Sequence, residues 1–124
     1  MSIRDVVSLA HFNSANASQG QTVKQFAQSQ RGKMVAALAG TANPASFFAI
    51  LESASLRIRP VVLADHGALG ANELSAIGER IIIMTAKDAV KCPPDPRVYV
   101  LRVQANPPAD LINWMTEQLS LIHI

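Results

Sequence analysis

Apolar residues occur in short blocks that Gly, Pro and polar residues separate. Five of these blocks are predicted strands: residues 6–12, 33–39, 56–63, 80–84 and 97–103. The block 80–84 contains three consecutive isoleucines, which is typical of a parallel strand covered on both faces. Pro60 interrupts the block 56–63 and favours an edge position for that strand, because proline has no N–H to donate to a neighbour.

The stretches between these strands carry helix signals. Predicted helices span residues 43–55, 73–77 and 85–92, and a last one opens at Pro107-Pro108. Asn43 is expected to accept a backbone N–H as the cap of the first helix, with Pro44 in its first turn. Thr85 is expected to cap the third helix. Residues 13–30 are rich in Asn, Ser, Gln and Ala, and are predicted as loop with about one helical turn near residues 23–27.

Strands and helices therefore alternate along the chain. This order predicts a Rossmann-like α/β fold of three layers, in which a mostly parallel sheet carries helices on both faces. In such sheets ligands bind beyond the carboxyl ends of the strands. The corresponding loops are residues 40–43, 64–68 and 85–88, and they hold the candidate chemistry of the chain.

Composition narrows the class of protein. The chain has 124 residues, of which 49% are hydrophobic and 16% charged, as in a single globular domain. A net charge of +2, without clusters of Lys, Arg and aromatic residues, argues against a nucleic-acid partner. The lone Cys92 excludes an internal disulfide and favours a reducing, cytoplasmic compartment. No apolar run approaches the roughly 18 residues that span a bilayer, so a soluble chain is expected.

Several motifs are missing from the sequence. It contains neither the Gly-x-x-x-x-Gly-Lys-Ser/Thr loop that cradles the phosphates of ATP nor the Gly-x-Gly-x-x-Gly turn of dinucleotide sites. The histidines His11, His66 and His123 lie far apart, without the spacing of metal ligands. The sequence therefore predicts no metal site and no phosphate loop.

Three loops offer candidate chemistry, each with a structural alternative. Asp65 precedes His66 at a predicted strand end, where a carboxylate can orient an imidazole for general-base work; alternatively the two form a solvated loop pair. Lys87 stands where it can meet an anion at a helix start, or it is the solvated flank of a capped helix. The turn before Asn43 offers backbone N–H groups to a phosphate, or simply begins a helix. When each loop is considered by itself, its local chemistry favours the structural alternative.

Taken together, three segments resemble a known family. They are residues 39–48 (AGTANPASFF), 63–69 (LADHGAL) and 84–92 (MTAKDAVKC). In this order and spacing they resemble the C-terminal domain of the tetraacyldisaccharide 4'-kinases, the lipid A 4'-kinases. The third segment is the most specific of the three. The resemblance covers about residues 33–118 and, more weakly, residues 5–32.

The resemblance implies an activity. Members of this family transfer the γ-phosphoryl group of ATP, with Mg²⁺, to the 4'-hydroxyl of a tetraacylated glucosamine disaccharide 1-phosphate, at the cytoplasmic face of the Gram-negative inner membrane. An N-terminal α/β domain carries the phosphate loop, and a C-terminal α/β domain closes the cleft and contributes a histidine. By motif position that histidine is His66, with Asp65 as its neighbour. The resemblance also implies that Asn43, Lys87 and Asp88 lie near the substrate or the nucleotide, with a structural role at the helix start as the alternative for Lys87 and Asp88.

The sequence departs from the family pattern at several points. Thr41 and Ala42 replace an isoleucine and a glycine, and Ala86 replaces a glutamate. The whole ATP-binding half is missing. Because phosphoryl transfer depends on that half, the chain alone is expected to be inactive and to bind neither ATP nor Mg²⁺. Its expected partners are the missing N-terminal kinase domain and, within the full enzyme, ATP and the lipid A disaccharide precursor.

Three parts are predicted along the chain: a divergent strand and polar loop in residues 1–32, the C-terminal kinase domain in residues 33–118, and a sequencing-adapter artefact in residues 119–124. The last six residues, LSLIHI, match the translation of a transposon-end adapter, and the alternative is an ordinary apolar tail. The leading interpretation is a fragment of a lipid A 4'-kinase. The alternatives are a non-catalytic α/β domain that binds or regulates a partner, and an unrelated phosphate-binding α/β domain.

Overall fold

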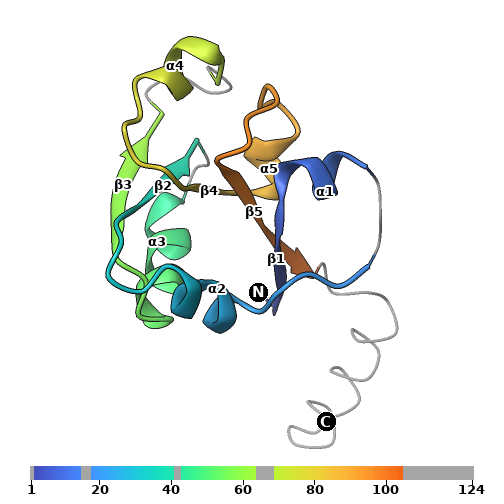
Figure 1. Cartoon of the computed structure of the whole chain (residues 1–124), viewed down its shortest axis with the longest axis vertical. Coiled ribbons are helices and arrows are strands. Elements are labelled where there is room, and N and C mark those ends of the chain that lie inside the picture. The colour runs from blue at the N-terminus through green and yellow to red at the C-terminus, as the bar shows by residue number, and fades with distance from the viewer. Residues whose placement is uncertain (1, 15–17, 41–42, 64–68, 105–124) are drawn as a thin grey trace, which may run out of the picture.

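The computed structural model describes residues 2–14, 18–40, 43–63 and 69–104. Within them the strands are β1 (Ser2–Ser8), β2 (Val35–Ala39), β3 (Ile58–Val62), β4 (Ile82–Thr85) and β5 (Val98–Gln104). The helices are α1 (Leu9–Asn13), α2 (Val23–Ser29), α3 (Pro44–Ser53), α4 (Ala71–Ser75) and α5 (Ala86–Ala89). Figure 1 shows β3 at one side of the sheet, and β1 and β5 at the other.

The strands form one sheet in the order β1-β5-β4-β2-β3. Neighbours among β2, β3, β4 and β5 are parallel, and β1 runs antiparallel to β5. This arrangement confirms the predicted mostly parallel α/β sheet. β3 is an edge strand, as Pro60 predicted, and Pro60 lies opposite Ala37 of β2.

Side chains of the central strands alternate between two apolar cores. In β2, Ala36 and Leu38 belong to one core, whereas Val35, Ala37 and Ala39 belong to the other. Helices α1, α4 and α5 pack into the first core, and α2 and α3 into the second. Because every residue of β2 is buried, this strand has no polar face, as expected of a sheet covered on both sides. The predicted three layers are confirmed.

The predicted strand over residues 6–12 is only partly correct. The strand begins earlier and ends at Ser8, and α1 follows at once. The Ser8 hydroxyl accepts the N–H of His11 at 3.1 Å, which makes Ser8 the cap of a helix. A serine inside an apolar run therefore marks the point where the chain changes from strand to helix.

The polar stretch that follows contains more helix than predicted. A reciprocal capping box starts α2: the Gln25 N–H donates to the Thr22 hydroxyl at 3.0 Å, and the Thr22 N–H donates to the Gln25 side chain at 2.9 Å. The helix runs two residues beyond the expected turn, to Ser29. It is anchored by Phe26, which is fully buried and lies 5.2 Å from the Tyr99 ring.

Two predicted side-chain caps are wrong. Asn43 occupies the cap position of α3, but its side chain makes no capping hydrogen bond, and Pro44 in the first turn removes one of the donors that needed a partner. Thr85 precedes α5 without capping it, because its hydroxyl donates instead to the Asp88 side chain at 3.4 Å. Both helices still begin where the sequence predicted.

The remaining helix boundaries differ by a few residues. The helix predicted over residues 73–77 begins earlier, at Ala71, because Glu73 accepts the Gly70 N–H at 2.8 Å and so closes a first turn. The helix predicted over residues 85–92 ends at Ala89. The helix predicted from Pro107 onward lies outside the described residues. Among the described helices none is long and apolar enough to cross a membrane.

A buried ion pair joins β1 to β5. The Arg102 guanidinium on β5 donates two hydrogen bonds to the Asp5 carboxylate on β1, at 2.6 and 2.5 Å. The Gly20 N–H donates to the same carboxylate at 2.6 Å, and Arg102 also reaches the Ser18 carbonyl at 2.9 Å. These bonds hold the polar stretch against the first strand.

Candidate functional site

Three strands end next to one another at the carboxyl edge of the sheet. Gly40 follows β2, Leu63 follows β3, and Thr85 ends β4. The β2–β3 ladder continues one step beyond the strands, since the Leu63 N–H donates to the Ala39 carbonyl at 2.9 Å. The fold therefore brings the predicted ligand-binding loops to one edge, as parallel strands require.

Asp88 joins two of these loops. Its carboxylate is buried and accepts the Gly40 N–H at 3.1 Å, across 48 residues of sequence. The Thr85 hydroxyl donates to the same oxygen at 3.4 Å. A hydrogen bond between an N–H and a carboxylate is stronger than one between neutral groups, so it fixes the start of α5 against the end of β2.

Gly40 is required by this close approach. A Cβ atom added to it would lie 3.1 Å from the Asp88 side-chain oxygen and 3.0 Å from the Leu63 side chain. Both distances are shorter than ordinary van der Waals contacts, so a larger residue would push the three loops apart. The three segments on which the family resemblance rests thus meet at one point, through Gly40, Leu63 and Asp88.

Two more of the predicted site residues are exposed. Asn43, directly before α3, and Lys87, in the first turn of α5, are both exposed. Asp65 and His66 lie outside the described residues. The chain is described again from Leu69, which is buried in the same core as α4 and α5.

Arg97 is a structural residue that sequence reasoning did not single out. Its guanidinium donates to the carbonyls of Leu74 at 2.9 Å and Ile77 at 2.7 Å, and pairs with Asp95 at 2.9 Å. It therefore fixes the end of α4, the helix that follows residues 64–68 in the chain. The only local signal is the Asp-Pro-Arg turn at residues 95–97, because the carbonyl partners are about 20 residues away.

Metal and thiol chemistry find no support in the described part of the chain. No group of three or more His, Cys, Asp and Glu side chains there is arranged to hold a metal ion. Burial raises the pKa of the Cys92 thiol to about 11, and nearby Asp95 adds to the rise. The thiol is therefore protonated at neutral pH, donates to the Pro93 carbonyl at 3.3 Å, and is no nucleophile.

The fold defines a class: an open α/β domain in which the ends of three parallel strands meet at one edge of the sheet. More particularly, the chain belongs to the family described as tetraacyldisaccharide-1-P 4'-kinase, whose model matches residues 3–120. This match confirms the resemblance noted in the sequence.

Individual relatives carry the same name. A tetraacyldisaccharide 4'-kinase of Stutzerimonas stutzeri is 37% identical over 91 residues, which are 72% of this chain and 27% of the relative. One of Alkalilimnicola ehrlichii is 38% identical over 94 residues, 74% of this chain and 28% of the relative. One of a Janthinobacterium species is 33% identical over 110 residues, which are 82% of this chain and 32% of the relative. The chain thus spans about a quarter to a third of these relatives, and no solved structure matches it.

Proposed function

We propose that this chain supplies one wall of the active site of a tetraacyldisaccharide 4'-kinase. The full enzyme would transfer the γ-phosphoryl group of ATP to the 4'-hydroxyl of a tetraacyl glucosamine disaccharide 1-phosphate, in lipid A biosynthesis. One observation carries the proposal: the three family segments, far apart in sequence, converge where the Asp88 carboxylate accepts the Gly40 N–H beside Leu63. Convergence at a carboxyl edge is what a ligand site requires.

In this proposal His66 is the general base for the acceptor. Its imidazole takes the proton of the 4'-hydroxyl while that oxygen bonds to the γ-phosphorus, and the bond from phosphorus to the bridging oxygen of ADP breaks. Asp65 orients the imidazole and stabilises the imidazolium that forms. Exposed Lys87 and Asn43 stand at the same edge and would attract and orient phosphate oxygens.

The other wall of the cleft would come from a domain with a phosphate loop, which also binds ATP and Mg²⁺. Phosphoryl transfer is mainly a matter of positioning phosphates and metal ions, and this sequence has no loop for that task. We therefore propose that the chain is inactive alone. The pairing with such a domain would take place at the cytoplasmic face of the inner membrane, where the lipid substrate is expected.

A chimera tests the proposal. The segment of the Stutzerimonas stutzeri relative that matches this chain is replaced by the chain itself, and ATP-dependent phosphorylation of the disaccharide acceptor is measured. We expect turnover by the chimera, none by the chain alone, and a loss of about 10²–10⁴-fold in the chimera with His66→Ala. His11→Ala is the matched control and should leave turnover unchanged. A folded chimera without activity, or turnover by the chain alone, would contradict the proposal.

The same chimera addresses the non-catalytic alternative. Ala86, which stands where the family pattern has glutamate, favours that alternative because it removes a carboxylate beside Lys87. If Ala86→Glu restores activity to an inactive but folded chimera, this copy is a non-catalytic relative. If the unmodified chimera is active, Ala86 is a tolerated variant.

A further inference from the structure

A concave site lies away from the carboxyl edge. It is a pocket of about 320 Å³ between α2 and the end of α3, lined by Lys24, Ala27, Gln28, Arg31, Ala54 and Ser55. Helix α3 starts after the end of β2 and finishes before β3 begins, so its last turn lies at the opposite edge of the sheet. Ten residues of helix place that turn about 15 Å from the Gly40–Asp88 contact.

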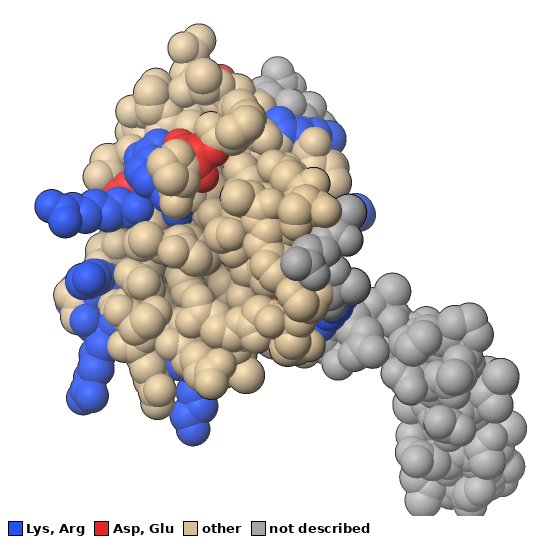
Figure 2. Space-filling view, turned by 45° about the vertical axis from the view of Figure 1, so that its right-hand side comes forward, with Lys and Arg blue, Asp and Glu red and all other residues tan. Residues whose placement is uncertain are grey.

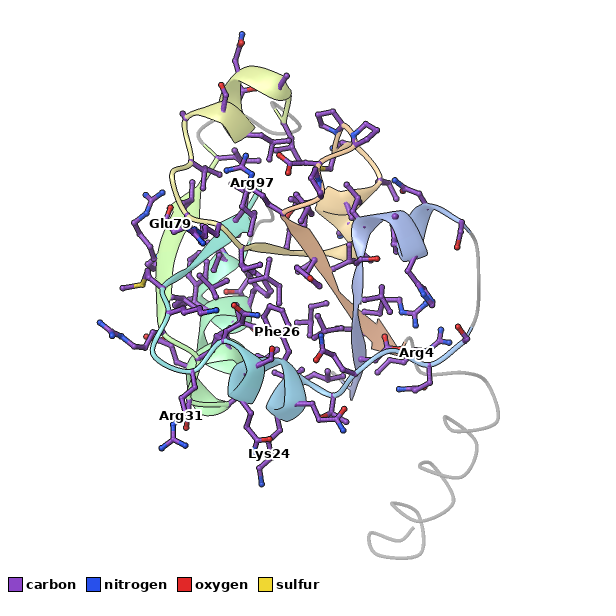
Figure 3. All side chains as sticks on the ribbon, viewed as in Figure 1. Arg4, Lys24, Phe26, Arg31, Glu79 and Arg97 are labelled. Carbon is purple, nitrogen blue, oxygen red and sulfur yellow. The ribbon has the colours of Figure 1, made fainter. Side chains whose placement is uncertain are left out.

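The charged groups of this pocket are both cationic. Lys24 and Arg31 are exposed, and both project away from the sheet on the same side, whereas Phe26 points inward (Figure 3). No carboxylate lines the pocket, and neither cation takes part in an ion pair within the described residues. In Figure 2, Lys and Arg side chains stand out from the left and lower margins with few acidic side chains beside the lower ones.

Ser55 adds a hydroxyl at a backbone position that glycine normally takes. Its φ is 67°, in the left-handed region. The Ser55 N–H donates to the Glu52 carbonyl at 2.9 Å and the Leu56 N–H to the Leu51 carbonyl at 3.2 Å, which is the usual termination of a helix by a glycine. Serine here is strained relative to glycine, and backbone strain of this kind concentrates at functional sites.

The helix end does not exclude an anion from the pocket. The carbonyl end of a helix carries partial negative charge, which by itself repels anions and attracts the two cations. The carbonyls of Leu51 and Glu52, however, are occupied by the backbone N–H groups of Leu56 and Ser55. The two full positive charges of Lys24 and Arg31, which also line the pocket, outweigh the partial charge of the helix end.

We propose that this pocket binds a phosphate-bearing anion. The Arg31 guanidinium and the Lys24 ammonium would neutralise the phosphate, the guanidinium with two parallel N–H donors. The Gln28 amide and the Ser55 hydroxyl would complete its hydrogen bonds. A free phosphomonoester and a phospholipid headgroup present the same chemistry. The proposal is independent of the kinase assignment, because it uses residues at the other edge of the sheet.

Amide chemical shifts of the full chain test the proposal. Inorganic phosphate is titrated first, then vesicles of phosphatidylglycerol, with phosphatidylcholine vesicles as the neutral comparison. We expect saturable shifts confined to residues 24–31 and 54–55. Saturable shifts with inorganic phosphate would identify a soluble phosphate ligand. Shifts that appear only with phosphatidylglycerol vesicles would identify a lipid headgroup. Either result supports the site, and the absence of saturable shifts with both probes overturns it.

Variants separate the pocket from net charge and from folding. Lys24→Gln with Arg31→Gln should weaken binding at least tenfold. Arg80→Gln with Lys91→Gln removes the same charge from exposed residues outside the pocket and should leave binding unchanged. Ser55→Gly should raise the melting temperature by a few degrees while weakening binding by roughly threefold, since one hydrogen bond is lost. Equal weakening by the two charge variants, or unchanged affinity of Ser55→Gly, overturns the proposed site.

Discussion

Two buried aspartates in this domain have partners of different kinds. Asp5, on β1, faces the Arg102 guanidinium and accepts two hydrogen bonds from it. Asp88, on α5, accepts its hydrogen bonds from neutral groups, the Gly40 N–H and the Thr85 hydroxyl. Within the described residues, no ion pair includes Asp88. Within the described part of the chain, one carboxylate therefore pairs with a full positive charge, and the other accepts hydrogen bonds from neutral groups.

The difference corresponds to two roles. A compensated pair far from any ligand loop holds secondary structure together, and losing one partner leaves a buried charge without compensation. A buried carboxylate that accepts hydrogen bonds from two different segments holds those segments together. The Asp5 region thus holds β1 against β5, whereas Asp88 joins the start of α5 to the end of β2, where the proposed site lies.

The largest expected effect concerns the scaffold pair. Arg102→Ala should lower the free energy of unfolding by about 3–5 kcal/mol, because Asp5 stays buried without its cation. Urea unfolding at pH 7, followed by circular dichroism, measures this loss. Arg59→Ala, which removes the exposed ion pair with Glu79, is the control and should change stability little. A loss below 1 kcal/mol for Arg102→Ala would show that the pair is not a scaffold element.

A smaller loss of stability is expected at the contact between Gly40, Leu63 and Asp88. Gly40→Ala should cost about 2 kcal/mol, because its Cβ would press on Leu63 and Asp88 at 3.0 and 3.1 Å. Gly78→Ala is the matched control, since a Cβ there meets nothing within 4 Å and its φ is not positive. That control should be neutral or slightly stabilising. Urea unfolding measures the stability of both variants. Equal stabilities would mean that the loops have room to separate.

The sequence predicted the sheet better than the side-chain contacts that hold it together. Buried isoleucines and Pro60 predicted a parallel sheet and its edge strand, because both signals are local. The Asp5–Arg102 pair joins residues 97 positions apart, and neither residue carries a local mark of that contact. The capping roles expected for Asn43 and Thr85 were wrong for a different, local reason. Propensity describes a helix start, but the Thr85 hydroxyl has a competing partner in Asp88, and Pro44 leaves one donor fewer for Asn43 to cap.

A further comparison separates two neighbours on α5. Asp88→Asn keeps an oxygen that can accept the Gly40 N–H but loses the charge, so a cost of about 1 kcal/mol is expected. Lys87→Ala removes an exposed side chain and should change stability by less than 0.5 kcal/mol. In the active chimera the order should reverse, with Lys87→Ala lowering turnover more strongly. A loss of stability in the Lys87 variant would instead place Lys87 in the scaffold.

The smallest expected effect is the pH dependence of stability that Asp5 contributes. The hydrogen bond from Arg102 is the largest cause that lowers the pKa of Asp5 below its ordinary value of 3.8. A lowered pKa in the folded state stabilises the fold above pH 3.8, and this contribution is lost as the pH falls from there through the folded-state pKa. Asp5 should therefore contribute no pH dependence between pH 7 and 5.

A matched variant isolates this contribution, because other carboxyls also respond to acid. Ion pairs with Arg59 and Arg97 lower the pKa values of Glu79 and Asp95 in the same direction. The double variant Asp5→Asn/Arg102→Met keeps these pairs and removes only the Asp5 titration. Its urea stability should therefore decline less steeply than that of the parent chain between pH 4 and 3. Equal slopes would mean that Arg102 does not depress the pKa of Asp5, and the contrast between the two aspartates would then rest on geometry alone.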